Sequence, residues 1–184
     1  MAKVTGQTLY LYANKHGLCT EVSSSWMVKH FSLIAESIYP DEQVLTAFSG
    51  FHNYQSISKH DGCFAYVITD KRFILAQKKI IGSVLQTISL QNVNDITMKK
   101  GLVNHTITVD TIKETFNVNT SDAESAKRVY TEIHNALETA KSGVARSVGA
   151  QNVTAQLVEL KKLLNAGIIN QRDFETKKKQ ILGI

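Results

Sequence analysis

The chain has 184 residues, of which 43% are hydrophobic and 20% are charged. These values are typical of one medium domain with an appendage, or of two small domains, and they exclude a wholly disordered chain. No apolar run approaches the ~20 residues that a membrane-spanning helix needs, and residues 1–12 lack the features of a signal peptide. Two cysteines, Cys19 and Cys63, are too few for a disulfide framework, so we expect a reduced, cytoplasmic protein.

The formal net charge of +5 lies mostly near the carboxyl end. Residues 143–184 carry seven bases and three acids, a net charge of +4, whereas residues 1–142 carry 14 bases and 13 acids, a net charge of +1. Domains that bind nucleic acid usually present a clustered basic face. The nearly neutral body disfavours nucleic acid as a partner, and a solvated helix face explains the lysines of the tail.

The first 35 residues predict a small extension. Thr8–Ala13 and Leu18–Val22 flank the sequence Asn-Lys-His-Gly, which is typical of a β-hairpin with a glycine turn. Ser23–Ser25 offers helix caps, and apolar residues then recur at roughly helical spacing. Pro40 ends this predicted helix.

Seven short runs of β-prone residues follow, separated by polar breaks. Within the sixth run, apolar and polar residues alternate with period two, which predicts one buried and one solvated face. Strands at about ten-residue spacing predict a sandwich or a barrel rather than alternating strands and helices. The seven runs are Val44–Phe51, Cys63–Thr69, Arg72–Gln77, Val84–Leu90, Val93–Met98, Val103–Val109 and Ile112–Val118.

Helical patterns occupy the rest of the chain. Ser121 and Glu124 fit a Ser-x-x-Glu capping box. The small, polar segment 142–151 contains two glycines and predicts a flexible linker. Residues 152–184 predict two short helices separated at Gly167. The helix that starts near Ser121 carries an apolar stripe that could close the open end of a barrel: Ala126, Val129, Tyr130, Ile133, Leu137 and Ala140.

Two segments resemble known families. Residues 44–50 (VLTAFSG) and 66–76 (YVITDKRFILA) closely resemble bacterial pleckstrin-homology (PH) domains, in which such a hairpin joins the second and third strands. Residues 157–182 are similar to the SHOCT (short carboxy-terminal) domain, through their Leu-x-x-Leu, Ala-Gly-Ile-Ile and Asp-Phe elements.

The resemblance implies a mainly β fold with helices (α+β). It consists of a seven-stranded antiparallel barrel capped by a carboxy-terminal helix, and then a short helical hairpin. We therefore expect an amino-terminal extension over 1–35, the barrel over 36–141, a linker over 142–151 and the hairpin over 152–184.

The resemblance also implies a protein-interaction or oligomerisation module without a catalytic residue set or a cofactor. The loop that binds inositides in eukaryotic relatives corresponds here to Tyr54–Asp61, which has one lysine and no arginine. Peripheral binding of anionic lipid and an uncharacterised enzymatic activity are therefore kept as alternatives. A candidate rim for an anionic ligand consists of Lys71, Arg72, Lys78 and Lys79.

Two His-x-x-Cys pairs, His16 with Cys19 and His60 with Cys63, hold four soft ligands that could in principle bind zinc. Because Cys63 opens an apolar strand, where a buried thiol is common, we predict no metal site. Zinc binding by the two pairs stays an alternative.

The hairpin carries an apolar stripe that is too large for two short helices to bury alone. We therefore expect the protein to self-associate through the hairpin, with docking on another protein as the alternative. The candidate contact residues are Leu157, Leu160, Leu164, Ile168, Ile169, Phe174, Ile181 and Leu182.

Overall fold

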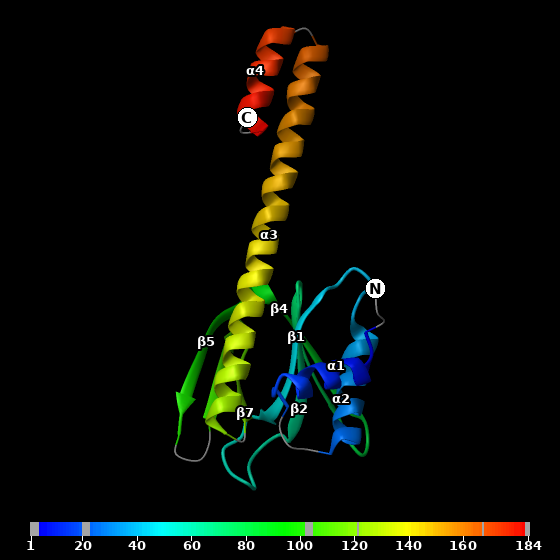
Figure 1. Cartoon of the computed structure of the whole chain (residues 1–184), viewed down its shortest axis with the longest axis vertical. Helices are drawn as coiled ribbons and strands as arrows, with labels where there is room; N and C mark the ends of the chain where they lie inside the picture. Colours follow the sequence, from blue (N-terminus) through cyan, green and yellow to red (C-terminus); the bar gives the residue numbers. More distant parts are fainter. Residues whose placement is uncertain (1–3, 20–22, 102–104, 121, 167, 183–184) are drawn as a thin grey trace. The chain divides into compact units, whose positions relative to one another are not determined.

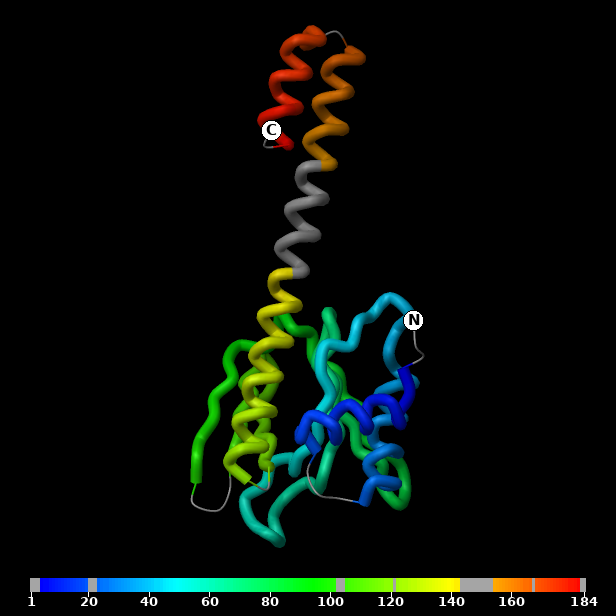
Figure 2. The backbone as a smooth tube through the Cα atoms, in the orientation of Figure 1, coloured from blue at the N-terminus to red at the C-terminus, as the bar shows by residue number. Residues whose placement is uncertain are grey.

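The computed structural model describes residues 4–19, 23–101, 105–120, 122–166 and 168–182, with the backbone alone for 143–153. The chain divides into two compact units, residues 1–140 and 141–184. Figures 1 and 2 show the elements of each unit. In the described residues, no helix is both long enough and apolar enough to cross a bilayer.

The first unit is built on one antiparallel sheet in the order β4-β3-β2-β1-β7-β6-β5. Among the described residues no backbone pairing joins β4 to β5, although a side-chain hydrogen bond from Gln86 to Glu114 connects β4 to the β6–β7 turn. A short 3₁₀ helix, Leu90–Asn92, follows β4. The strands are β1 (Val44–His52), β2 (Cys63–Thr69), β3 (Arg72–Lys78), β4 (Ser83–Ser89), β5 (Val93–Lys100), β6 (His105–Thr111) and β7 (Thr115–Thr120).

The seven predicted runs correspond to these seven strands, with one shift. β7 begins three residues later than expected because Ile112, Lys113 and Glu114 form the turn. Thr111 holds that turn closed, since its backbone N–H and its hydroxyl donate to the Glu114 carbonyl at 2.9 and 2.7 Å. The expected start of the sixth strand, Val103, lies outside the described residues.

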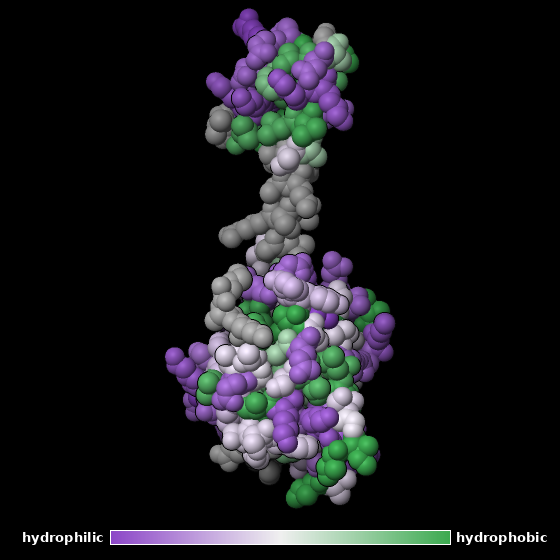
Figure 3. All heavy atoms as spheres, turned by 90° about the vertical axis from the view of Figure 1, so that its right-hand side faces the viewer, coloured by the Kyte–Doolittle hydropathy of each residue, from purple (hydrophilic) through white to green (hydrophobic). Residues whose placement is uncertain are grey.

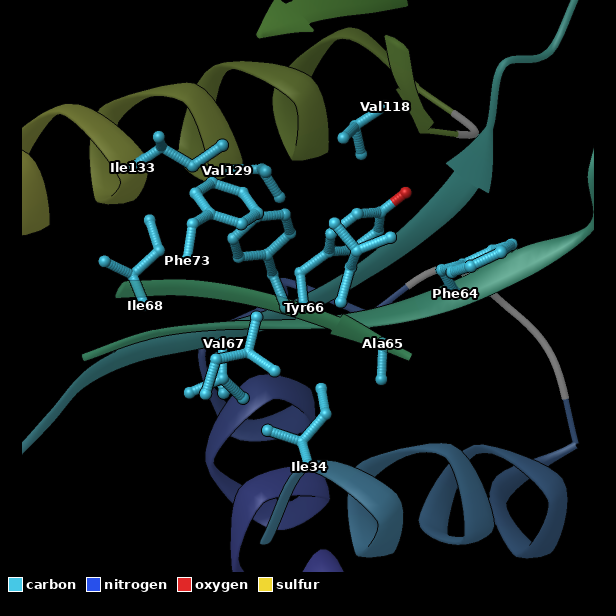
Figure 4. Close-up of a cluster of buried hydrophobic side chains, with 14 of the residues drawn as sticks. Ile34, Phe64, Ala65, Tyr66, Val67, Ile68, Phe73, Val118, Val129 and Ile133 are labelled. Atoms are coloured by element: carbon cyan, nitrogen blue, oxygen red, sulfur yellow. The ribbon is translucent and has the colours of Figure 1, made fainter. Parts of the chain in front are cut away.

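The core lies on both faces of the central strands, as Figure 4 shows. Val129 and Ile133 of α3 (Ala123–Asn165) lie on the same side as Tyr66, and Ile34 of α2 (Ser24–Ser37) lies on the opposite side near Val67. Every residue of β2 is buried. Because both of its faces are covered, β2 is a continuous apolar run rather than an alternating one.

The predicted amino-terminal hairpin is wrong, because Thr8–Ala13 lies inside helix α1 (Gly6–Lys15). Thr5 and Thr8 form a reciprocal capping box at its start. Leu9 and Ala13, four residues apart, place one buried face against the unit. Leu18 follows the helix, and its carbonyl accepts the Ser49 N–H of β1 at 3.0 Å; residues 20–22 of the second expected strand lie outside the described part.

Helices α1 and α2 belong to the first unit rather than to a separate extension. Helix α1 packs on α2 and β1, and α2 packs on β2 and β3. Figure 1 shows both helices together on one side of the sheet. The compact unit therefore begins before residue 36, where we expected the barrel to start.

Helix α3 is longer than the predicted closing helix. Asp122 Oδ1 accepts the Glu124 and Ser125 N–H groups at 3.0 and 2.8 Å, so Asp122 caps the helix, while Ser121 lies outside the described residues. The backbone stays helical through 142–151, so the expected flexible linker is not an irregular segment. Its two glycines each cost a helix about 1 kcal/mol relative to alanine, which the helix tolerates.

The second unit contains the end of α3 and helix α4 (Gln171–Leu182). Asn170 Oδ1 accepts the Asp173 N–H at 2.9 Å and thereby caps α4. Gly167, which we expected to separate the helices, lies outside the described residues. The two helical elements of the predicted hairpin are therefore present.

Candidate functional site

Two of the four rim residues, Lys71 and Arg72, are held by neighbouring carboxylates. Arg72 Nε and Nη2 donate to Glu42 Oε1 and Oε2 at 2.7 and 2.8 Å, which is a bidentate pair. Arg72 Nη2 also donates to the Ser37 carbonyl at 2.7 Å. Lys71 Nζ pairs with Asp41 at 2.5 Å. These contacts fasten the β2–β3 turn to the segment that follows α2.

Electrostatics agree with this structural role. Burial raises the pKa of Glu42, but hydrogen bonds from Arg72 and from the Tyr39 backbone N–H outweigh that effect, so the pKa lies below its usual range. The hydrogen bond from Lys71, together with its charge, lowers the pKa of Asp41. Both pairs are therefore ionised near neutral pH, and their cations already have anionic partners.

The other two rim residues lie at the opposite end of β3. Arg72 opens this seven-residue strand and Lys78 closes it, which separates them by about 20 Å at the usual rise per residue. The Lys78 backbone N–H donates to His30 Nδ1 at 3.1 Å, and Lys79 begins the β3–β4 turn. The structure therefore does not bring the four predicted residues into one rim.

A pocket of about 470 Å³ lies at the end of the sheet that carries Lys79. The β1–β2 and β3–β4 connections lie next to each other there, because Gln77 Nε2 donates to the Asp61 carbonyl at 2.9 Å. The sequence did not predict this pocket, because its walls come from four strands and two connections with no common spacing. Its lining consists of His52, His60, Asp61, Phe64, Leu75, Gln77, Lys79, Val84 and Gln86.

His52 forms the inner wall of the pocket. Its Nδ1 and the hydroxyl of the buried Tyr66 are hydrogen-bonded at 2.9 Å, and its ring stacks on Phe116 with 5.3 Å between centroids. Burial lowers the pKa of His52, although Asp61 and Glu114 oppose this effect. The imidazole is therefore mainly neutral at pH 7, and it serves as a polar contact of the core.

The charges around the pocket do not favour a polyanionic headgroup. Lys79 is its one lysine, while Asp61 lines it and Glu114 is hydrogen-bonded to the lining residue Gln86. Binding of inositol phosphates would require several cationic donors at this position. The scarcity of bases in the 54–61 loop, visible in the sequence, already indicated this.

The two His-x-x-Cys pairs lie in the described part of the chain, where no three potential metal ligands come together. Cys63 is buried, and burial followed by the neighbouring Cys19 thiol raises its pKa to about 12. His60 Nδ1 accepts the Gly62 N–H at 2.9 Å. A thiol with this pKa is protonated at neutral pH.

The predicted contact residues of the hairpin differ in exposure. Lys161 and Lys178 lie over the Phe174 ring, with their Nζ atoms 5.4 and 6.0 Å from its centroid, so two of the tail lysines cover an apolar side chain. Among the set, Leu160 is buried, Ile168 and Leu182 are exposed, and the half-buried residues are Leu157, Leu164, Ile169, Phe174 and Ile181.

A protein-family model described as "Bacterial PH domain" matches residues 38–135, which is more than half of the chain. The chain belongs to this family. Its seven antiparallel strands followed by a helix form the PH-like α+β fold. A second model, "Short C-terminal domain" (SHOCT), matches residues 155–182 in the helical hairpin.

Several solved structures are similar to this PH-family chain at low identity. The N-terminal PH domain of Vps36 aligns with a TM-score of 0.41 at 13% identity, over 57% of this chain and 86% of that one. The hSac2 domain of human phosphoinositide phosphatase Sac2 aligns with a TM-score of 0.42 at 13% identity, over 62% of this chain and 85% of that one. A DUF1696-family protein with a PH domain from Shewanella loihica aligns with a TM-score of 0.32 at 11% identity, over 48% of this chain and 72% of that one. No curated protein matches the chain.

Proposed function

We propose that this PH–SHOCT protein is a non-enzymatic, cytoplasmic interaction module that self-associates, and that its carboxy-terminal hairpin contributes to the contact between copies. One observation supports this proposal above the others. Within the described side chains of residues 141–184, Leu160 is the one hydrophobic residue that is buried, and it is still 8% exposed. A unit with so small a core gains little from folding alone.

The apolar surface left on the hairpin supplies the driving force for association. Ile168, in the connection between the helices, is 69% exposed, and Leu182 of α4 is 42% exposed. Of the half-buried residues of the stripe, Ile169 lies in the same connection, and the others lie on α3 and α4: Leu157, Leu164, Phe174 and Ile181. Full burial of one such side chain contributes about 1.5–3 kcal/mol. A few of them together offset the loss of translational and rotational freedom that association costs, about 4–15 kcal/mol.

The charge of the hairpin makes a second, opposing contribution. Because residues 143–184 carry a net charge of +4, two hairpins repel each other at low ionic strength. Added salt screens this repulsion. We therefore expect self-association to strengthen as the salt concentration rises.

The alternative of lipid binding at the predicted rim has less support, because Lys71 and Arg72 are ion-paired and lie far from Lys78 and Lys79. An enzymatic role has no supporting constellation in the described residues. The buried His52 contacts a tyrosine hydroxyl and aromatic rings rather than an activated nucleophile.

Sedimentation equilibrium of the full chain at tens of micromolar tests the proposal. The informative variant is Ile168→Ser/Leu182→Ser, and the matched control is Ile112→Ser, because Ile112 in the first unit is 67% exposed. We expect an oligomer that the double variant weakens at least tenfold and the control leaves unchanged. A monomeric wild-type chain would refute self-association. An unchanged oligomer in the double variant would place the contact elsewhere.

A further inference from the structure

Strand β5 forms one edge of the sheet in the first unit. In the described part of the chain it pairs with β6 alone, so between Asp95 and Lys100 one row of N–H and C=O groups has no backbone partner. Figures 1 and 2 show β5 at the left margin of the unit, with no other element beyond it. Such an edge can accept a strand from another chain, and proteins usually protect it with charges, prolines or bulges.

This edge lacks two of the usual protections over most of its length. A bulge between Val93 and Asp95 interrupts only the start of β5, and the register with β6 is continuous from Asp95 to Lys100. The one proline of the chain, Pro40, lies elsewhere. The other edge strand, β4, contains no charged residue, and Figure 3 shows the side of the unit on which α1 and α2 cover the sheet. β5 is therefore the edge whose charges can select a partner.

The two faces of β5 differ in polarity. Ile96 and Met98 are half-buried and pack against the core. Asp95, Thr97 and Lys99 alternate with them and are exposed on the opposite face. Asp95 and Lys99 have opposite charges, but four residues of strand separate them by about 13 Å, so they cannot contact each other. Neither forms an ion pair within the described part of the chain.

Two copies of β5 are self-complementary when they pair antiparallel about a two-fold axis at Thr97. Each residue then lies opposite the residue that is equally far from Thr97 on the other side. Asp95 of each copy faces Lys99 of the other, and on the second face Ile96 lies opposite Met98. An axis at Ile96 or at Met98 would instead place both charged residues opposite uncharged ones. The charges therefore select a single register.

We infer that β5 is a contact surface for a second copy of this chain, whose β5 pairs with it antiparallel and joins the two sheets. Lysine is also a common protecting residue at sheet edges, but protection alone requires no acid at the mirrored position. The contact goes beyond the proposed self-association, because it uses the first unit and does not involve the hairpin. Two different contacts on one chain allow assemblies larger than a dimer.

Sedimentation equilibrium of the full chain tests this contact in the Ile168→Ser/Leu182→Ser background, which removes apolar side chains from the hairpin contact. Asp95→Lys places lysines opposite each other in both pairs, and Lys99→Asp does the same with aspartates. An equimolar mixture of the two variants restores opposite charges in both pairs. The control is Lys113→Asp, the same change of charge at an exposed residue of the β6–β7 turn.

We expect the background chain and the control to dimerise equally, each single variant to dimerise at least tenfold more weakly, and the mixture to recover most of the lost affinity. The dimer should weaken as salt rises, the opposite of the trend expected for the hairpin. A background chain that stays monomeric at hundreds of micromolar, or a mixture that associates no better than either variant alone, would overturn the inference. Comparison of the wild-type chain with the background chain tests the hairpin proposal separately.

Discussion

Substitution of Arg72 by alanine tests whether the β2–β3 turn depends on a buried ion pair. The Arg72 and Glu42 side chains are 16% and 0% exposed, so neither charge can be solvated freely when its partner is lost. The substitution would leave the Glu42 carboxylate with the Tyr39 N–H and the Thr69 hydroxyl as its remaining donors. Arg72 also lies over the Tyr39 ring, 4.5 Å from its centroid, and this contact would be lost as well.

Loss of one partner from a buried pair costs about 3–5 kcal/mol, because an unpaired charge stays buried. The adjacent Lys71 provides a matched control, since its pair with Asp41 joins side chains that are 44% and 75% exposed. Solvent screens such an exposed pair, so its loss should change the free energy of unfolding little. Given a typical stability of about 5–15 kcal/mol, Arg72→Ala should remove a large part of it and Lys71→Ala almost none.

Urea unfolding followed by the fluorescence of Trp26 measures this difference, because Trp26 is the single tryptophan and lies in α2 of the first unit. The double variant Arg72→Met/Glu42→Leu removes both charges and should recover most of the loss from Arg72→Ala. Equal effects of the Arg72 and Lys71 substitutions, or a loss below about 1 kcal/mol for Arg72→Ala, would refute the reasoning.

Three further predictions concern other parts of the chain. Gly6→Ala should lower the free energy of unfolding by about 1–3 kcal/mol, because its Cβ would lie 2.6 Å from the Ser32 backbone nitrogen; a urea midpoint equal to wild type would contradict this. Burial lowers the pKa of His30 and His52 below the value of 6.5 expected in the unfolded chain. The free energy of unfolding that their neutral rings contribute is therefore fully present above pH 6.5 and is lost as the pH falls below it. Urea midpoints at about pH 7.5 and about pH 5.5 should therefore differ, and the difference should shrink in His30→Gln. Leu160→Ala should reduce helical circular dichroism without moving the tryptophan transition; a shifted transition would show that the units unfold together.

The sheet could be predicted from the sequence because its signals are local. Runs of β-prone residues between regular polar breaks predicted seven strands, with period-two alternation in the sixth run, and the turn closed by Thr111 changed one boundary by three residues. The same kind of local pattern predicted a strand over Thr8–Ala13 wrongly, because Leu9 and Leu11 are spaced two residues apart as they would be in a strand. A capping box and burial of Ala13 select the helix instead.

The partners of the rim residues and the pocket beside Lys79 could not be predicted, because they depend on contacts between residues that are far apart in the sequence. Lys71 and Arg72 were predicted as part of a rim for an anionic ligand, yet each is paired with an acid that lies 30 residues earlier in the chain. The adjacent pair Asp41–Glu42 was a signal that could have suggested this match, since a two-residue acidic turn faces a two-residue basic one. The pocket beside Lys79 left no such signal, because strand pairing alone brings its walls together.

The burial of Tyr66, whose hydroxyl is hydrogen-bonded to His52, also has a spectroscopic consequence. Tyr66 is fully buried, and burial, followed by the nearby Cys63 and Asp61, raises its pKa well above the usual value of 10. Its phenolate therefore forms only when the core opens, and alkaline pH favours that opening. Because the chain has six tyrosines, only the tyrosinate absorbance that is absent from a Tyr66→Phe variant would record how often the aromatic centre of the sheet is exposed to hydroxide. The protein thus carries, without any label, an optical reporter of its own opening.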